Sequence, residues 1–147
     1  MSKRIIGIAC DHGGFTIKEF VKELLLSDNN YAVVDFGCHS EESVGYPEYA
    51  HRLAEAVASG EVETGIALCG SGIGMSMALN KHKEIRAGLC WGEELGRLTR
   101  QHNDANVLVL PGRFVDEAKA EKIVRTFLET PFEGGRHIAR VEQIPLK

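Results

Sequence analysis

Apolar residues are arranged along the chain in two alternating patterns, short continuous runs and stripes with helical spacing. The short runs are rich in β-branched residues and end at polar or glycine-rich segments, which is typical of buried strands. They cover residues 4–9, 31–36, 65–69, 86–90 and 106–110. Between them, apolar residues recur every three or four positions, as on the buried face of a helix. The pattern therefore predicts five strands that alternate with helices.

Local signals mark the ends of the predicted helices. The first helix starts near Phe15, carries an apolar stripe and is broken by residues 27–30. The second has Pro47 in its first turn and ends at Gly60, as these residue types prefer. Further helices are expected at 75–80, 93–101 and 115–129, with a short one in the tail. The side chains expected to pack are Ile17, Phe20, Val21, Leu24, Leu25, Ala50, Leu53, Ala54, Val57, Ala118, Ile123, Val124, Phe127 and Leu128.

This alternation predicts the fold class. Strands joined through helices form a parallel sheet with right-handed crossovers and helices on both faces. We therefore expect an α/β protein, a three-layer α/β/α sandwich with a five-stranded parallel, Rossmann-like sheet. A chain of 147 residues is the usual size of one domain, so residues 1–147 are expected to form a single domain. Ligands of such sheets bind beyond the carboxyl ends of the strands.

Composition and charge exclude several classes of protein. The hydrophobic fraction of 44% and the charged fraction of 26% are those of an ordinary globular protein. A net charge of −4 argues against nucleic-acid binding. The apolar runs are too short to cross a membrane, and the N-terminus lacks a secretory signal. Four cysteines without metal-binding spacing indicate reduced thiols and a cytoplasmic protein. Cys10, Cys38, Cys90 and Trp91 are interpreted as packing residues.

The third predicted strand runs directly into a glycine-rich loop, residues 69–74, and then into a helix. Glycines bring backbone N–H groups close to a ligand, so the loop is suited to an anion. Cys69 would stand beside it as a candidate acid, base or nucleophile. The spacing fits neither the dinucleotide fingerprint nor the P-loop. The alternative is a tight structural turn next to a core cysteine.

Other polar residues lie where chemistry is expected. Asp11 and His12 follow the first strand, and Arg113 follows the fifth. Arg136 and Arg140 are four residues apart, so a helix would present both to one phosphate. Each also has a simpler interpretation. Asp11 could only cap a helix, the histidines could lie on the surface, and the arginines could form a solvated face.

Several motifs in order resemble the ribose-5-phosphate isomerase type B family, which includes allose-6-phosphate and galactose-6-phosphate isomerases. They stand at residues 10–14, 43–47, 69–76, 78–81, 100–106, 134–137 and 140–141. The resemblance covers nearly the whole chain and implies the strand order 2-1-3-5-4. Gly45 departs from it, because members usually carry an acidic residue there. Met75 occupies the position of a glutamate base in members that lack the cysteine, but Cys69 is present here.

The resemblance implies interconversion of an aldose phosphate and a ketose phosphate without metal or organic cofactor. It implies that Cys69, as thiolate, removes the C2 proton, and that Ser71 moves protons between O1 and O2 of a cis-enediolate. His102 and Asp11 would open the sugar ring. The residues implied in binding are His12, Arg113, Arg136 and Arg140 for the phosphate, Gly70, Gly72, Gly74 and Asn103 for the enediolate, and Tyr46.

The resemblance also implies a homodimer, or a dimer of dimers, with sites across the subunit interface. His102, Asn103 and Arg113 would then serve the Cys69 of a partner subunit. The tail, about residues 131–147, would pack at that interface. The substrate is expected to be ribose 5-phosphate, since galactose-6-phosphate members lack the sequence found at residues 101–103. The alternatives are a hexose 6-phosphate isomerase, acting on allose 6-phosphate, and a non-catalytic sugar-phosphate-binding protein on the same fold.

Overall fold

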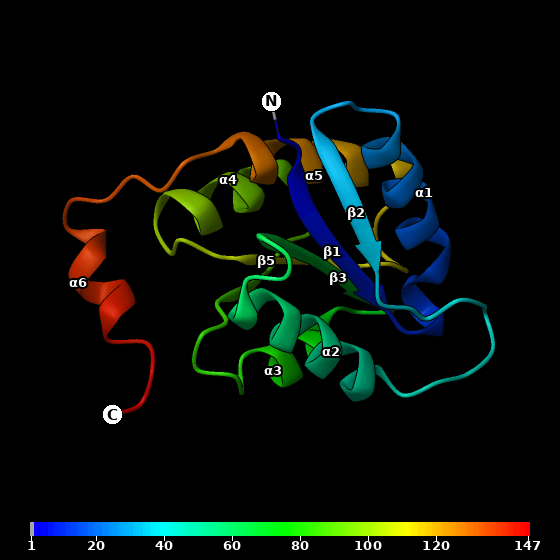
Figure 1. Ribbon diagram of the computed structural model, residues 1–147, viewed down its shortest axis with the longest axis horizontal. Helices are drawn as coiled ribbons and strands as arrows, with labels where there is room; N and C mark the ends of the chain where they lie inside the picture. Colours follow the sequence, from blue (N-terminus) through cyan, green and yellow to red (C-terminus); the bar gives the residue numbers. More distant parts are fainter. Residues whose placement is uncertain (1) are drawn as a thin grey trace.

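The predicted α/β/α sandwich and the strand order are confirmed. The computed structural model describes residues 2–147, and its five strands form one parallel sheet in the order β2-β1-β3-β5-β4 (Figure 1). The strands are β1 (Arg4–Cys10), β2 (Tyr31–Asp35), β3 (Thr64–Cys69), β4 (Ala87–Leu89) and β5 (Val107–Pro111). The helices are α1 (Phe15–Leu26), α2 (Tyr46–Ser59), α3 (Ile73–Leu79), α4 (Glu93–Gln101), α5 (Glu117–Glu129) and α6 (His137–Glu142), with a 3₁₀ turn at His12–Gly14.

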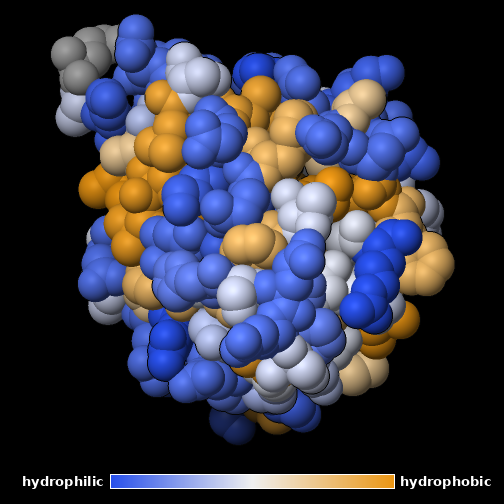
Figure 2. Space-filling view, turned by 90° about the vertical axis from the view of Figure 1, so that its right-hand side faces the viewer, coloured by the Kyte–Doolittle hydropathy of each residue, from blue (hydrophilic) through white to orange (hydrophobic). Residues whose placement is uncertain are grey.

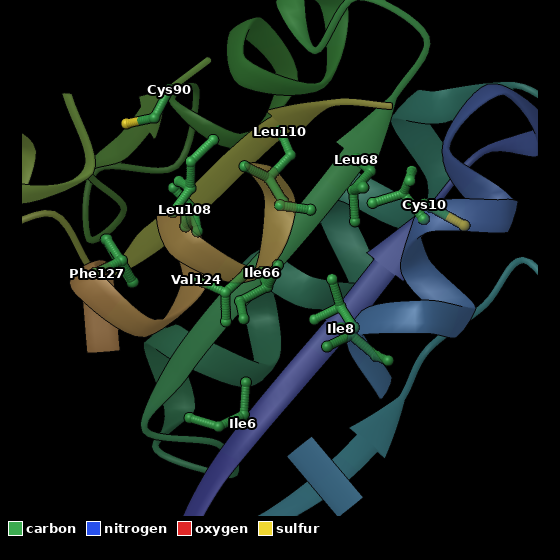
Figure 3. Packing of buried hydrophobic residues seen from close by; sticks show 14 of the residues in the cluster. Ile6, Ile8, Cys10, Ile66, Leu68, Cys90, Leu108, Leu110, Val124 and Phe127 are labelled. Atoms are coloured by element: carbon green, nitrogen blue, oxygen red, sulfur yellow. The ribbon is translucent and has the colours of Figure 1, made fainter. Parts of the chain in front are cut away.

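The sheet is buried on both faces because successive side chains of a strand point to opposite sides. Ile8 of β1 and Leu108 of β5 belong to a cluster under α1 and α5, and α4 packs on α5 (Figure 3). Ala9 and Ala67 lie on the other face, under α2 and α3. This double burial explains why the strands are continuous apolar runs.

The cysteines differ in which face they occupy. Cys10, Cys38 and Cys90 are buried as expected, in the cluster under α1 and α5. Burial raises the pKa of the Cys90 thiol to about 12, and burial together with the neighbouring Cys38 raises the pKa of Cys10. Cys69 belongs to the cluster on the opposite face, under α2 and α3. The interpretation of Trp91 as a packing residue is wrong, because 57% of it is exposed.

The start of α5 differs from the sequence prediction. The helix begins at Glu117 and not at residue 115, because the Asp116 carboxylate accepts a hydrogen bond of 2.8 Å from the Lys119 N–H and caps it. This start leaves Ala118 exposed, although it was expected to pack, and buries Ala120 instead.

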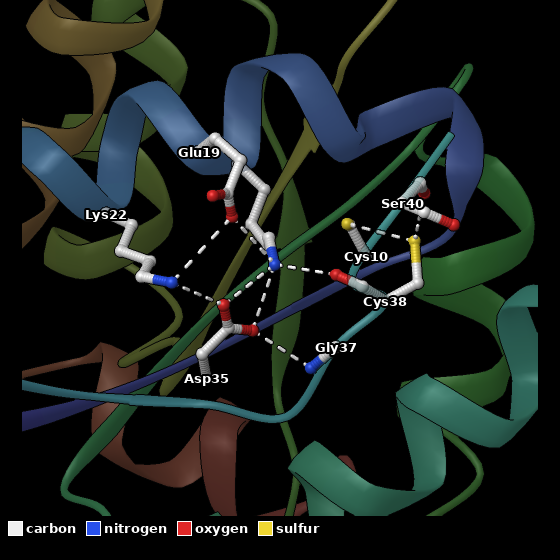
Figure 4. Close-up of polar contacts among 8 residues, drawn as sticks. Cys10, Glu19, Lys22, Asp35, Gly37, Cys38 and Ser40 are labelled. Atoms are coloured by element: carbon white, nitrogen blue, oxygen red, sulfur yellow. Dashed lines mark hydrogen bonds and ion pairs between the residues drawn. The ribbon is translucent and has the colours of Figure 1, made fainter. Parts of the chain in front are cut away.

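A buried ion pair joins α1 to β2 and was not predicted (Figure 4). Lys18 is fully buried and donates to both carboxylate oxygens of Asp35, at 3.0 and 2.8 Å, and to the Cys38 carbonyl at 2.7 Å. Burial alone would raise the pKa of Asp35, but hydrogen bonds from Lys18 and the Gly37 N–H lower it overall. The pair therefore holds Asp35 ionised within the α1 layer.

The last helix, α6, lies apart from the sheet. It stands at the left end of the molecule, on the side opposite the arrowheads of β1 and β2 (Figure 1). The opposite face, to the right in that view, is mostly hydrophilic with separate hydrophobic areas (Figure 2). Within residues 2–147, no helix is both long enough and apolar enough to span a bilayer.

Candidate active site

Three loops at the carboxyl edge of the sheet are joined through their backbones. They follow β1, β3 and β5, and each connecting bond runs from an N–H of one loop to a carbonyl of β3 or its loop. The bonds are Asp11 N–H to the Leu68 carbonyl (3.2 Å), Gly112 N–H to the Cys69 carbonyl (2.9 Å) and Arg113 N–H to the Gly70 carbonyl (3.0 Å). These backbone bonds join the three loops into one platform.

An open pocket of about 660 Å³ lies on this platform. This volume is within the range usual for small-molecule sites. It is lined by Asp11, Tyr46, Cys69, Gly70, Ser71, Ile73, Gly74, Met77, Arg113 and Phe114. Seven of these ten were expected from the sequence or the resemblance, and the three apolar residues were not. This pocket lies at the carboxyl ends of the strands, where ligands of parallel sheets usually bind.

The Cys69 thiol is the most enclosed reactive group of the pocket, with only 5% of the residue exposed. The Gly72 N–H donates to its sulfur at 3.1 Å. Ser71 lies beside it, and its Oγ accepts from the Ile73 N–H at 3.2 Å. This bond uses an acceptor position of the hydroxyl and leaves its proton available to a ligand. The arrangement provides a sulfur stabilised by an N–H donor next to a hydroxyl.

Two glycines of the loop are required by contacts around them. Gly72 has φ +78°, and a Cβ there would stand 2.5 Å from Leu89 Cδ1. A Cβ on Gly74 would stand 2.5 Å from Tyr46 Cζ. Tyr46 therefore packs directly on the loop from the start of α2, which is why it lines the pocket. Larger residues at either position would displace the groups that surround Cys69.

Asp11 and His12 are fixed in different ways. Asp11 is 8% exposed and lines the pocket, and its Oδ1 accepts from the Gly13 N–H at 2.9 Å, so it caps the 3₁₀ turn as well. His12 is half-buried, outside the pocket lining, and its Nδ1 accepts from the Val44 N–H at 3.1 Å. In the tautomer in which Nδ1 accepts, Nε2 carries the ring proton and can donate to an anion, whereas the Val44 carbonyl, 3.2 Å from Nδ1, fits the other tautomer.

The remaining expected site residues lie at the other edge of the sheet. His102 caps the end of α4, and Asn103 follows it, both ahead of β5. Arg140 is exposed on α6, and Arg136 is exposed directly before its first residue. A five-residue strand such as β5 spans roughly 16 Å, so these groups do not meet Cys69 of the same chain. Arg113 does meet it, which corrects the expectation that Arg113 serves the Cys69 of a partner.

His102 has two neighbours to which the sequence assigned no role. Its ring stacks on that of His137, with centroids 4.4 Å apart and planes inclined by 14°. Glu133 Oε1 lies 3.5 Å from His137 Nε2. These three side chains are the group within residues 2–147 whose ligand atoms are close enough to hold a metal ion. His137 belongs to the motif at residues 134–137 and lies four residues after Glu133, and this spacing was the only signal in the sequence.

The pocket has an exposed apolar rim that sequence patterns did not indicate. Ile73, Met77 and Phe114 are 51%, 64% and 71% exposed. Next to them, Trp91 lines a second hollow with Leu89, Pro111 and Lys119. Clustered exposed apolar side chains are typical of interaction sites. The Met75 side chain, by contrast, is fully buried beneath the loop.

The fold and the pocket define an α/β protein with a Rossmann-like sheet and a candidate small-molecule site at its carboxyl edge. Residues 6–144 match the family model described as Ribose/Galactose Isomerase. The chain belongs to this family, which accounts for both the strand order and the loop motifs.

Individual relatives agree with this assignment. Ribose-5-phosphate isomerase B of Escherichia coli is 46% identical over 140 residues, which are 95% of this chain and 93% of that protein. The crystal structure of a ribose 5-phosphate isomerase from Thermotoga maritima has a TM-score of 0.95 at 49% identity, covering 98% of this chain and 99% of that one. A type B ribose 5-phosphate isomerase from Trypanosoma brucei has a TM-score of 0.93 at 44% identity, covering 97% of each chain.

Proposed function

We propose that the protein interconverts ribose 5-phosphate and ribulose 5-phosphate through a cis-enediolate, with Cys69 as the base. The observation that carries the proposal is the position of its sulfur, enclosed at the floor of the pocket and bound by the Gly72 N–H at 3.1 Å. Family membership and the names of the similar isomerases support the choice of substrate. No step of this scheme requires a cofactor.

The proposed reaction divides the work among the pocket residues. Asp11 and His102 transfer the protons that open the sugar ring. Cys69 removes the C2 proton and returns it at C1, while the Ser71 hydroxyl transfers the proton between O1 and O2. The enediolate is an anion, and backbone N–H groups of residues 70–74 are the donors nearest to Cys69. Arg113 and His12 Nε2 bind the phosphate, whose binding energy orients C1 and C2.

The groups at the other edge of the sheet complete the site in a homodimer. His102 of one chain opens the ring at the Cys69 pocket of the second, and Asn103, Arg136 and Arg140 bind the same substrate. Two features support this arrangement. First, these residues lie far from the pocket of their own chain. Second, the rim of the pocket is apolar and exposed. In this assembly the tail packs at the subunit interface.

Cys69→Ala tests the chemistry. General-base catalysis contributes about 10²–10⁴-fold, so kcat/KM for ribose 5-phosphate should fall by at least that factor. Phosphate binding should stay nearly intact, because the arginines are unchanged. Cys90→Ala is the matched control, since its buried thiol lies away from the pocket. Wild-type kcat/KM in Cys69→Ala would mean that another group is the base.

Mixing two inactive variants tests the shared site. Cys69→Ala and His102→Asn protein would be unfolded together, refolded and assayed. If each site takes Cys69 from one chain and His102 from the other, half of the dimers are mixed and have one intact site. Activity should return to about a quarter of the wild-type value. No recovery would place both residues in a site made by one chain.

Relative kcat/KM for ribose 5-phosphate and allose 6-phosphate would test the substrate assignment. A higher value for the hexose phosphate would assign the protein to the other branch of the family. Loss of both activities, with sugar-phosphate binding retained, would indicate a binding protein.

A further inference from the structure

The side chains of His102, Glu133 and His137 meet where the C-terminal tail crosses the end of α4. One ligand atom of each lies within 4.8 Å of the other two. His137 is only 4% exposed, and its Nε2 has no hydrogen-bond partner among residues 2–147. A buried polar atom of this kind is unfavourable unless another group satisfies it.

The backbone holds the three side chains in this position. The Glu133 N–H donates to the Gln101 carbonyl at 3.1 Å, which ties the tail to the residue before His102. The His137 N–H donates to the Gly134 carbonyl at 3.1 Å and starts α6. The cluster is therefore built by the chain itself and does not depend on a chance contact of long exposed side chains.

The donor set and its spacing suit a zinc ion. Two imidazoles and one carboxylate, with a fourth position open to water, are a ligand set that Zn²⁺ adopts in proteins. Zinc–ligand bonds of about 2.0–2.1 Å place tetrahedral ligand atoms about 3.3 Å apart. Glu133 Oε1 and His137 Nε2 are already 3.5 Å apart. His102 has to turn its ring out of the stack on His137, because parallel rings do not share a metal in their planes.

We propose that one Zn²⁺ per chain binds His102, Glu133 and His137 and acts as an inhibitor, not as a cofactor. Binding replaces waters on the ion with two nitrogen bonds and one oxygen bond, and gives His137 Nε2 the partner that it lacks. The inhibition rests on the function proposed above, because a metal-bound His102 nitrogen can no longer transfer a proton to the sugar. The binding itself does not depend on that function.

Calorimetric titration of the metal-free protein with ZnCl₂ tests the binding directly. One site per chain is expected, and Glu133→Gln should weaken it by about 10- to 100-fold or more, since even outer-shell changes cost that much. Glu133 is exposed, so this variant should fold normally. His137→Gln should weaken binding at least as much. His82→Gln is the matched control, because His82 and His51 form the other close histidine pair, with nitrogens 2.7 Å apart.

Unchanged zinc affinity in Glu133→Gln and His137→Gln would overturn the site. Loss of binding only in His82→Gln would move it to the exposed pair between α2 and the end of α3. Because these outcomes are read without an activity assay, they stand even if ribose 5-phosphate is not the substrate.

Inhibition is tested in Glu133→Gln, whose basal activity should match that of the wild type. Zinc should inhibit the wild-type isomerase near its dissociation constant. In Glu133→Gln, the inhibitory concentration should rise by the same factor as the dissociation constant. Zinc that binds at the site without inhibiting would refute the blocking of His102. An isomerase that is inactive without zinc would show the metal to be required and overturn the inhibitory role.

Discussion

Replacing Gly72 by alanine should reduce both stability and activity, by an amount that can be divided into two parts. Gly72 has φ +78°, and a non-glycine residue in the left-handed region costs about 1–2 kcal/mol. The added Cβ would also stand 2.5 Å from Leu89 Cδ1 and 3.3 Å from the Leu110 carbonyl. Overpacking of this kind costs about 1–3 kcal/mol. Gly72→Ala should therefore lower the free energy of unfolding by about 2–5 kcal/mol.

Gly60 separates the two contributions. It has φ +83° at the end of α2, and a Cβ there would meet nothing within 4 Å. Gly60→Ala should therefore cost only the backbone term of about 1–2 kcal/mol. Urea unfolding of both variants at one protein concentration gives the two free energies. Sharing one concentration matters because assembly makes apparent stability concentration-dependent.

The activity of the same two variants tests the platform. Movement of the loop away from Leu89 would shift the Gly72 N–H that bonds Cys69, so kcat/KM should fall in Gly72→Ala at temperatures where it remains folded. Gly60→Ala should retain wild-type kcat/KM. Equal stability losses in the two variants, or full activity in Gly72→Ala, would refute the argument that close packing fixes this loop.

The remaining predictions concern charged groups. Arg136→Ala or Arg140→Ala should raise KM for ribose 5-phosphate about 10- to 100-fold, as expected for a lost hydrogen bond to a charged group. Arg97→Ala, at another exposed arginine, is the control and should leave KM unchanged. An unchanged KM in Arg136→Ala and in Arg140→Ala would exclude the phosphate role. Lys18→Met should lower the free energy of unfolding by about 1–3 kcal/mol, because the partly buried Asp35 carboxylate loses its main partner and keeps only Lys22 and the Gly37 N–H. The lowered pKa of Asp35 contributes stability above the ordinary carboxyl pKa of about 3.9, and this stability is lost as pH falls through the folded-state value. Acid unfolding should therefore begin at a higher pH in Lys18→Met than in the wild type. Acid unfolding of the two proteins at the same pH would contradict the pairing.

The sheet could be predicted because its strands are buried on both faces and carry an unambiguous signal. The ends of helices depend on single side chains, and α5 starts two residues later than predicted because Asp116 caps it. Lys18 was missed for a different reason. A lysine within an apolar stripe reads as an exposed residue, and its partner Asp35 is seventeen positions away with no periodic relation to it. Pairing across elements of this kind leaves no local pattern.

In the candidate site, too, some groupings of residues could be predicted from the sequence and others could not. Asp11, Cys69 and Arg113 were expected at one edge because each follows a strand of a parallel sheet. The stacking of His102 on His137 depends on the path of the tail, which is fixed by a backbone hydrogen bond from Glu133 to Gln101. Backbone bonds between loops carry no residue preference, so the sequence could not indicate which groups they bring together.

The backbone bonds between the three loops have a consequence for how this family can diversify. Because the N–H and carbonyl groups of Asp11, Gly70, Gly112 and Arg113 fix the course of the loops, most side chains on the platform can be exchanged without rerouting the chain. The glycines at 72 and 74 are the exceptions, since their neighbours leave no room. Substitutions that adapt the pocket to sugars of different length should therefore accumulate at Tyr46 and on the apolar rim of Ile73, Met77 and Phe114, while the backbone of the loops stays the same.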